Sequence, residues 1–236
     1  MLNPDTPTSD EEMMRRCFAL AKKSAEQGEY PYAAVIVRKG VIVAESINKV
    51  AHDRDVTHHA ELVAICQAQA TLGGTDLADC TIYTNMEPCA FCSYAIRESR
   101  IARVVFSLRS PIMGGASRWN ILGDRTLSDS MPEIFAPPPV LVAELLGEEG
   151  DAVLRKSAPI AWRILRARGL LATPSPHGAA ADPAHAGAVP RKRWLAGAPK
   201  WLMRILRRNF FDRFGRGKAT LGKRGPHASD GVKPSP

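Results

Sequence analysis

The sequence lacks the features that mark membrane-spanning, secreted and disulfide-stabilised proteins. No apolar run approaches the roughly 20 residues needed to cross a bilayer. The five cysteines are too few and too irregularly spaced for a disulfide scaffold, and Met1–Asp5 shows neither the basic nor the apolar region of a signal peptide. We therefore expect a reduced, cytoplasmic protein, in which 45% apolar residues can supply one good-sized core.

The body of the chain also lacks net charge, although the whole chain carries +8. Residues 173–236 hold 13 basic and 3 acidic residues, which leaves 19 basic and 21 acidic residues in 1–172. The overall charge is thus no indication that the body binds nucleic acid. We expect a domain at 1–172, a flexible linker at 173–190 rich in Ala, Pro and Gly, and a basic tail at 191–236.

The tail contains an amphipathic helical pattern at about 194–214, with aromatic and basic residues. Such a helix can lie on an anionic membrane surface or bind RNA. It can also fold back on its own domain or on a dimer partner. The sequence leaves these three interpretations open.

Two short motifs dominate the body: His59-Ala60-Glu61, and Pro88-Cys89-Ala90-Phe91-Cys92. Imidazole and thiolate are zinc ligands, and a catalytic zinc has three protein ligands and an open fourth position. His59, Cys89 and Cys92 supply three, and Glu61 lies close enough to reach a water at the fourth. The alternative is a helix-opening histidine and coincidental buried thiols. We expect both motifs to open helices, with Pro88 at the first helical position.

The pattern of the remaining residues predicts alternating helices and strands. Ser9 and Glu12 form a capping-box pattern that starts a helix, and Gly28 is placed to end it. Strands are expected at 33–37, 41–44, 80–84 and 101–106, a loop at 48–57, and helices from 59 to about 72 and at 89–99. On the first of these two helices we expect Leu62, Val63, Ile65 and Cys66 in the core. The order predicts an α/β fold, a three-layer α/β/α sandwich.

The core of this domain is expected at about 10–107, with pocket-closing and C-terminal elements at 108–172. Within the second part, helical patterns cover Val140–Leu146 and Ile160–Arg168. Their arrangement cannot be read from the sequence.

On the two motifs, residues about 10–107 resemble the cytidine/deoxycytidylate deaminase superfamily, whose signature joins H-x-E to P-C-x-x-C. The short C-x-x-C segment is similar to the guanine deaminase, cytosine deaminase and tRNA adenosine deaminase branches. The resemblance implies a central mixed sheet, one zinc per chain held by His59, Cys89 and Cys92, and Glu61 as the proton shuttle. It further implies that the Ala60 N–H and Asn48 hydrogen-bond the base; the alternative for Asn48 is a residue of a strand-ending turn. We also expect a homodimer.

The chain departs from the family pattern at several positions. Val56 and His58 stand where the family often has Pro and a small or apolar residue, and His58 either lines the pocket or is a spectator. The Lys-Thr-Gly-Ala-type run of bacterial tRNA adenosine deaminases is replaced by Ser110–Leu122. In that segment Gly114-Gly115 offers backbone freedom, and Trp119 either stacks on a base or caps the core under a loop.

These observations predict a zinc-dependent hydrolytic deaminase of a guanine- or cytosine-like base or nucleoside, which releases ammonia. A tRNA-specific adenosine deaminase is the alternative, favoured by the basic tail but not by the altered segment. A non-catalytic, zinc-stabilised interaction module is a further alternative, against which the presence of Glu61 argues.

Overall fold

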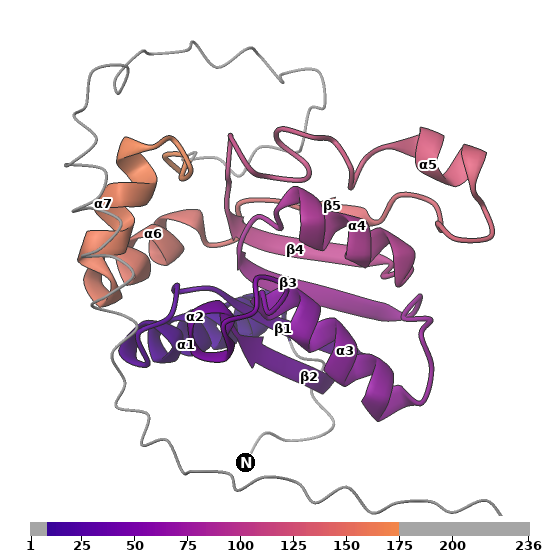
Figure 1. Cartoon of the computed structure of the whole chain (residues 1–236), viewed down its shortest axis with the longest axis horizontal. Helices are drawn as coiled ribbons and strands as arrows, with labels where there is room; N and C mark the ends of the chain where they lie inside the picture. Colours follow the sequence, from indigo (N-terminus) through magenta and orange to yellow (C-terminus); the bar gives the residue numbers. More distant parts are fainter. Residues whose placement is uncertain (1–8, 175–236) are drawn as a thin grey trace, which may run out of the picture.

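The computed structural model describes residues 9–174 (Figure 1). A five-stranded mixed sheet forms the centre, with strand order β2-β1-β3-β4-β5. Its strands are β1 (Ala33–Arg38), β2 (Val41–Ile47), β3 (Cys80–Met86), β4 (Arg103–Leu108) and β5 (Val140–Val142). β1 pairs antiparallel with both β2 and β3, while β3, β4 and β5 run parallel. The predicted mixed sheet is therefore confirmed.

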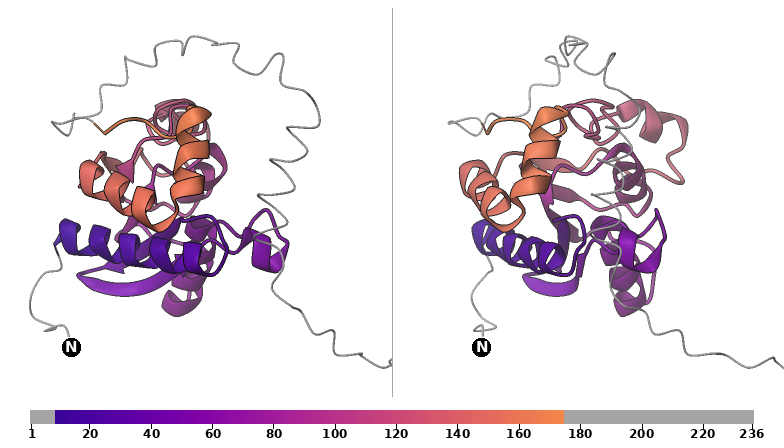
Figure 2. Two further views of the ribbon diagram at one scale, coloured as in Figure 1. Left: turned by 90° about the vertical axis from the view of Figure 1, so that its left-hand side faces the viewer. Right: turned by 60° about the vertical axis from the view of Figure 1, so that its left-hand side comes forward.

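Helices cover both faces of this sheet. One face carries α3 (Ala60–Leu72) and α4 (Ala90–Glu98); the other carries α1 (Asp10–Glu26), α6 (Gly147–Ser157) and α7 (Pro159–Ala167), as the right view of Figure 2 shows. Alternate residues of β1 divide between the two faces, because successive side chains of a strand point to opposite sides. Ala34 and Ile36 pack in the cluster with α3 and α4, and Val35 and Val37 in the cluster with α1. This is the predicted three-layer sandwich.

Local sequence signals set the ends of several helices. The Ser9 side chain accepts from the Glu12 N–H and the Glu12 side chain accepts from the Ser9 N–H, so the predicted capping box is present. Gly28 follows α1 with φ of 81°, a conformation that favours glycine. Within 9–174, no helix has the length and apolar character needed to cross a membrane.

The predicted helical pattern at Val140–Leu146 is wrong, because residues 140–142 form β5. A short apolar run fits either structure, and here pairing with β4 decides it, through register partners such as Val104 and Leu141. The pattern at Ile160–Arg168 is confirmed as α7. A short helix, α5 (Arg125–Ser130), lies in the connection between β4 and β5.

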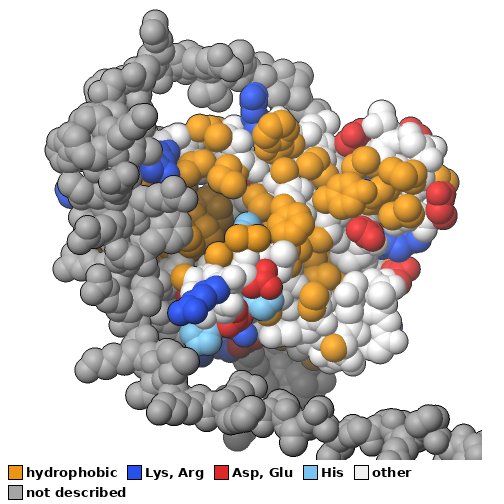
Figure 3. All heavy atoms as spheres, viewed as in Figure 1, with side chains coloured by type: hydrophobic (Ala, Val, Ile, Leu, Met, Phe, Trp, Pro, Cys, Tyr) orange, Lys and Arg blue, Asp and Glu red, His pale blue; other side chains and the backbone are white. Residues whose placement is uncertain are grey.

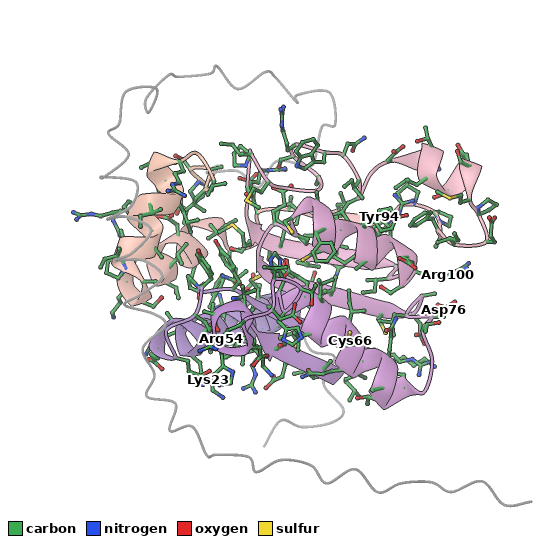
Figure 4. The ribbon with its side chains drawn as sticks, viewed as in Figure 1. Lys23, Arg54, Cys66, Asp76, Tyr94 and Arg100 are labelled. Carbon is green, nitrogen blue, oxygen red and sulfur yellow. The ribbon has the colours of Figure 1, made fainter. Side chains whose placement is uncertain are left out.

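Two further expectations are corrected. The segment 48–57, expected as a loop, contains the one-turn helix α2 (Val50–Asp53). Cys66, expected in the core, is exposed on α3 (Figure 4). The buried stripe of α3 contains Ala60, Glu61, Ala64, Ile65 and Ala68, and Cys66 lies off that stripe. Nearly all of the predicted linker and the whole basic tail lie outside the described residues.

Candidate functional site

His59, Cys89 and Cys92 meet at the ends of two helices. The His59 Nδ1 lies 3.6 Å from the Cys89 Sγ and 3.3 Å from the Cys92 Sγ, and the two sulfurs are 3.6 Å apart. Tetrahedral zinc, with bonds of about 2.0 Å to nitrogen and about 2.3 Å to sulfur, holds its ligand atoms about 3.6 Å apart. The three side chains therefore have both the chemistry and the spacing of a zinc site.

The backbone explains how residues so far apart in sequence converge. His59 is the N-cap of α3 and Cys89 the N-cap of α4, both with extended backbone, and the two helices lie on the same face of the sheet. Cys92 follows in the first turn of α4. Pro88 precedes the N-cap and is not the first helical residue as predicted, because Cys89 takes the cap and Ala90 begins the helix.

The three ligand side chains influence each other's protonation. The contact with the Cys92 thiol, followed by the contact with His59, lowers the pKa of Cys89 to about 4, despite burial. The same contact with Cys89 raises the pKa of His59, and the Cys89 anion together with burial raises the pKa of Cys92. Both thiols must lose their protons to bind a metal, and without one it is Cys89 whose pKa is lowered.

Glu61 lies beside this cluster in the first turn of α3. It is 9% exposed, and its carboxyl group contacts both its own backbone N–H and the Cys92 side chain. Burial, reinforced by the neighbouring Cys89 thiolate, raises the pKa of Glu61 to about 7. A carboxyl group with a pKa near neutrality can both accept and donate a proton at physiological pH. The N–H of Ala60, at the first position of α3, is one of those that a helix leaves without an intrahelical partner.

Asn48 lies directly after β2 and is 2% exposed. Its backbone N–H donates to the Tyr32 carbonyl, and its side-chain Nδ2 donates to Glu29 at 2.9 Å. The next residue, Lys49, donates its N–H to the carbonyl of His58, the neighbour of the ligand His59. The Asn48 segment is thereby fastened to the segment that carries the zinc site.

The segment after β4 folds around a buried carboxylate that the sequence did not single out. Glu87 is 3% exposed and accepts from the N–H groups of Ser110, Ala116 and Ser117 and from the Ser117 hydroxyl. Because Glu87 stands two residues before Cys89, these bonds hold the segment against the metal-binding turn. Nothing local in the sequence distinguishes Glu87 from a surface glutamate.

Gly114 and Gly115 serve close packing in this segment. Neither has a positive φ, which differs from the backbone freedom expected from the sequence. A Cβ on Gly114 would overlap the Glu87 carboxyl group, and a Cβ on Gly115 would overlap the Ser93 side chain on α4. The absence of a side chain lets the segment reach the start of α4, where the Gly115 N–H donates to the Pro88 carbonyl.

Aromatic and other apolar side chains are exposed on α4 and on the adjoining segment after β4. Trp119 is 57% exposed, so it does not cap the core, and the Arg118 guanidinium lies 5.5 Å from its ring centre. Phe91 is also exposed and meets the His59 ring edge-on, with the ring centres 6.3 Å apart. Figure 3 shows hydrophobic side chains gathered over α4 and the adjoining segment, and Figure 4 places Tyr94 on this helix. The sequence had indicated only Trp119 of this surface.

His58 does not join the zinc ligands. Its Nδ1 lies 2.7 Å from an Asp53 carboxylate oxygen and its Nε2 lies 3.5 Å from Asp55. It lines an outer groove beside α3, together with Lys49 and Leu62, and none of the three zinc ligands lines that groove. Of the two interpretations left open by the sequence, the geometry favours a residue outside the zinc site.

Comparisons with known proteins agree with this geometry. Residues 7–108 match the family described as the cytidine and deoxycytidylate deaminase zinc-binding region. The chain is 40% identical over 118 residues to the tRNA-specific adenosine deaminase of Aquifex aeolicus, covering 50% of this chain and 78% of that protein. The chain belongs to the cytidine and deoxycytidylate deaminase family. It is a zinc-binding hydrolytic deaminase, and the expectation of an enzyme with zinc is confirmed.

Two solved structures resemble the fold of this deaminase. One, from a study of A-to-I editing by tRNA:A34 deaminases, is 29% identical with a TM-score of 0.51 and covers 60% of this chain and 98% of that one. The other, the guanine deaminase of Nitrosomonas europaea, is 22% identical with a TM-score of 0.51, covering 66% and 87%. At this identity the second likeness concerns the fold alone.

Proposed function

We propose that this deaminase converts adenosine to inosine in tRNA, as the names of its relatives indicate for those proteins. The observation that carries the proposal is the 40% identity over 118 residues to a tRNA-specific adenosine deaminase, which extends across 78% of that relative. This reverses the preference drawn from the sequence, where a guanine- or cytosine-like base came first and tRNA adenosine was the alternative.

The exposed surface around the zinc site supports a single-stranded RNA substrate. Phe91 and Trp119 present flat rings to solvent, and Arg118 lies beside the second of these. Proteins bind single-stranded nucleic acid by stacking bases on aromatic side chains and by placing cations near the backbone. Exposed rings outside the zinc site would not be needed to hold a free base.

The site residues divide the proposed reaction among them. When bound by His59, Cys89 and Cys92, zinc lowers the pKa of water so that hydroxide is available at neutral pH. Glu61 accepts the proton of the attacking water and passes it to the ring nitrogen beside the amino-bearing carbon. Glu61 then takes the proton of the hydroxyl group added at that carbon and delivers it to the amine, which leaves as ammonia while the carbonyl forms. Asn48 and the Ala60 N–H hold the polar edge of the base.

A free base remains the competing substrate because Ser110–Leu122 departs from the run found in bacterial tRNA adenosine deaminases. The guanine deaminase of Nitrosomonas europaea is only 22% identical to this chain, so its similar fold is no evidence about the substrate. The two substrates can be separated by one assay.

The test is ammonia release from guanine, cytosine, cytidine, adenosine and an RNA stem-loop with adenosine in its loop. We expect turnover of the stem-loop, with inosine identified by mass spectrometry, and no turnover of a matched stem-loop carrying guanosine at that position. Turnover of guanine or cytosine with an inert stem-loop would restore the free-base interpretation. The homodimer remains a prediction, which light scattering of the purified protein tests.

A further inference from the structure

Glu29 is a buried carboxylate that the zinc site does not use. It lies between α1 and β1 and is 5% exposed. Its backbone is fixed, because its N–H donates to the Ser24 carbonyl at the end of α1, and the Ser24 hydroxyl donates to the Tyr30 carbonyl. A buried carboxylate requires hydrogen-bond donors in place of water. Its donors therefore show which part of the molecule it organises.

All three donors come from the segment that follows β2. One carboxylate oxygen accepts from the Asn48 side-chain Nδ2 at 2.9 Å and from the Ala51 N–H at 3.2 Å. The other accepts from the His52 N–H. Ala51 and His52 belong to the first turn of α2, whose N-cap, Lys49, makes no side-chain capping bond. Glu29, which is distant in sequence, thus accepts from the first N–H groups of α2 and takes the role of the missing N-cap side chain.

The bond to Asn48 also decides how its amide is turned. An ionised carboxylate only accepts hydrogen bonds, so it holds the NH₂ end of the amide and would repel the oxygen end. The amide oxygen and the second N–H of Nδ2 are then left for another partner. With the backbone held by Tyr32 and the next residue by His58, the side chain has one orientation relative to the zinc ligands.

We infer that Glu29 is a positioning residue for substrate recognition: it fixes the Asn48 amide and the α2 turn so that Asn48 meets the base in one orientation. Glu29 itself does not touch the base. This inference rests on the proposed function, in which Asn48 binds the base. It assigns Glu29 to substrate binding and separates it from the zinc and proton chemistry.

The test is a double-mutant cycle with Glu29→Gln and Asn48→Ala on the adenosine-containing stem-loop. Gln has the size of Glu but offers one acceptor oxygen to the three donors, so the hold on the Asn48 amide and on α2 is weakened. We expect kcat/KM to fall about tenfold, the value of one hydrogen bond to a charged group, mainly through KM. In the Asn48→Ala background, Glu29→Gln should change kcat/KM less than about twofold, because residues that act through one another are not additive.

The matched control is Glu45→Gln, which removes a carboxylate that pairs with Arg16 away from the site. It should leave kcat/KM and zinc content unchanged, and Glu29→Gln should also retain zinc. Equal losses from Glu29→Gln in the two backgrounds would overturn the inference and make Glu29 a general structural residue.

A measurement without substrate keeps the inference separate from the proposed function. In the ¹⁵N spectrum of the zinc-loaded protein, Glu29→Gln should shift the side-chain amide protons of Asn48 and speed their exchange with water. An unchanged Asn48 amide refutes the inference whatever the substrate is. An altered amide together with an inert stem-loop upholds the Glu29–Asn48 link and rejects RNA as the substrate.

Discussion

Glu61 and Cys92 are neighbouring buried side chains, and the proposed reaction requires different behaviour from each of them. The thiolate must stay bound to the metal throughout, whereas the carboxyl group must exchange protons in every cycle. Burial serves both requirements, since it raises the pKa of Glu61 to about 7 and keeps water from the metal-binding sulfur. Substitutions at these two positions should therefore fail in different ways.

Replacing Glu61 by Gln should leave zinc and fold intact and abolish most of the activity. Gln keeps the size and one acceptor of the side chain but cannot carry a proton. We expect kcat to fall by about 10² or more, as for other general acid–base residues. Steady-state kinetics with parallel zinc analysis measures this. Near-normal turnover with Glu61→Gln would show that another group moves the protons.

Replacing Cys92 by Ala should remove the metal itself. With two ligands left, bound zinc should be lost and the unfolding temperature should drop by about 5 °C or more, because metal binding is coupled to folding. Cys66→Ala is the matched control, since Cys66 is exposed on the same face of the sheet and contributes no ligand. Full zinc occupancy in Cys92→Ala, measured by elemental analysis, would contradict the ligand assignment.

At the scale of elements, the segment after β4 depends on close approach to α4. Gly115→Ala should lower the free energy of unfolding by about 2 kcal/mol, because the new methyl group overlaps buried Ser93 and cannot be accommodated without a backbone shift. Gly74→Ala is the matched control, with no atom within 4 Å of the added Cβ. Urea unfolding of both variants tests the difference, and equal stability would show that the segment is not tightly seated.

The attachment of α1 to the sheet should give the stability a pH dependence. The Arg103 guanidinium, helped by the Tyr83 hydroxyl, lowers the pKa of Asp10 below the ordinary 3.8. Since the folded-state pKa is depressed, the stabilisation is present above about the unfolded value and is lost as pH falls through it to the folded value. Because Asp10 is partly exposed, we expect about 1 kcal/mol at neutral pH.

Asp10→Asn isolates this contribution. The stability difference between wild type and Asp10→Asn, measured by urea unfolding, should shrink as the pH falls below 3.8. A difference that is the same at every pH would mean that the ion pair contributes nothing.

The elements that could be predicted are those with local signals. Ser9 and Glu12 predict the start of α1, and the two motifs predict the starts of α3 and α4 to within a residue. The elements that were missed depend on distant partners: α2 is capped by Glu29, β5 exists through its pairing with β4, and Ser110–Ser117 folds around Glu87. A sequence pattern shows only which residues are close along the chain. The partners of α2, β5 and Ser110–Ser117 are distant in sequence, so the pattern could not show them.

The candidate site shows the same division. The three ligands and Glu61 follow from residue type and spacing, because zinc accepts few ligand sets. The orientation of Asn48 and the exposed ring of Phe91 follow from packing and could not be read in advance. For His58 the sequence left open only whether it lines the pocket or is a spectator, because its contacts with Asp53 and Asp55 form through folding of the preceding turn.

At the scale of the whole molecule, the charge separation makes a prediction about RNA. The body is nearly neutral, and residues 173–236 hold 13 basic against 3 acidic residues. If the tail contacts RNA, deleting 175–236 should weaken stem-loop deamination and flatten its salt dependence by about 0.7 in log–log slope for each lost phosphate contact. Zinc content should be unaffected. Equal salt slopes with and without the tail would assign the tail to a membrane surface or a partner.

Zinc binding also lowers the conformational entropy of the incompletely folded chain. His59 and Cys92 are 33 positions apart and enclose α3, β3 and the start of α4. A metal that joins them closes a loop, and in the chain-entropy model a cross-link of this span is worth about 4 kcal/mol, comparable to a disulfide. When zinc is bound, it therefore ties the start of α3 to the start of α4 much as a disulfide would.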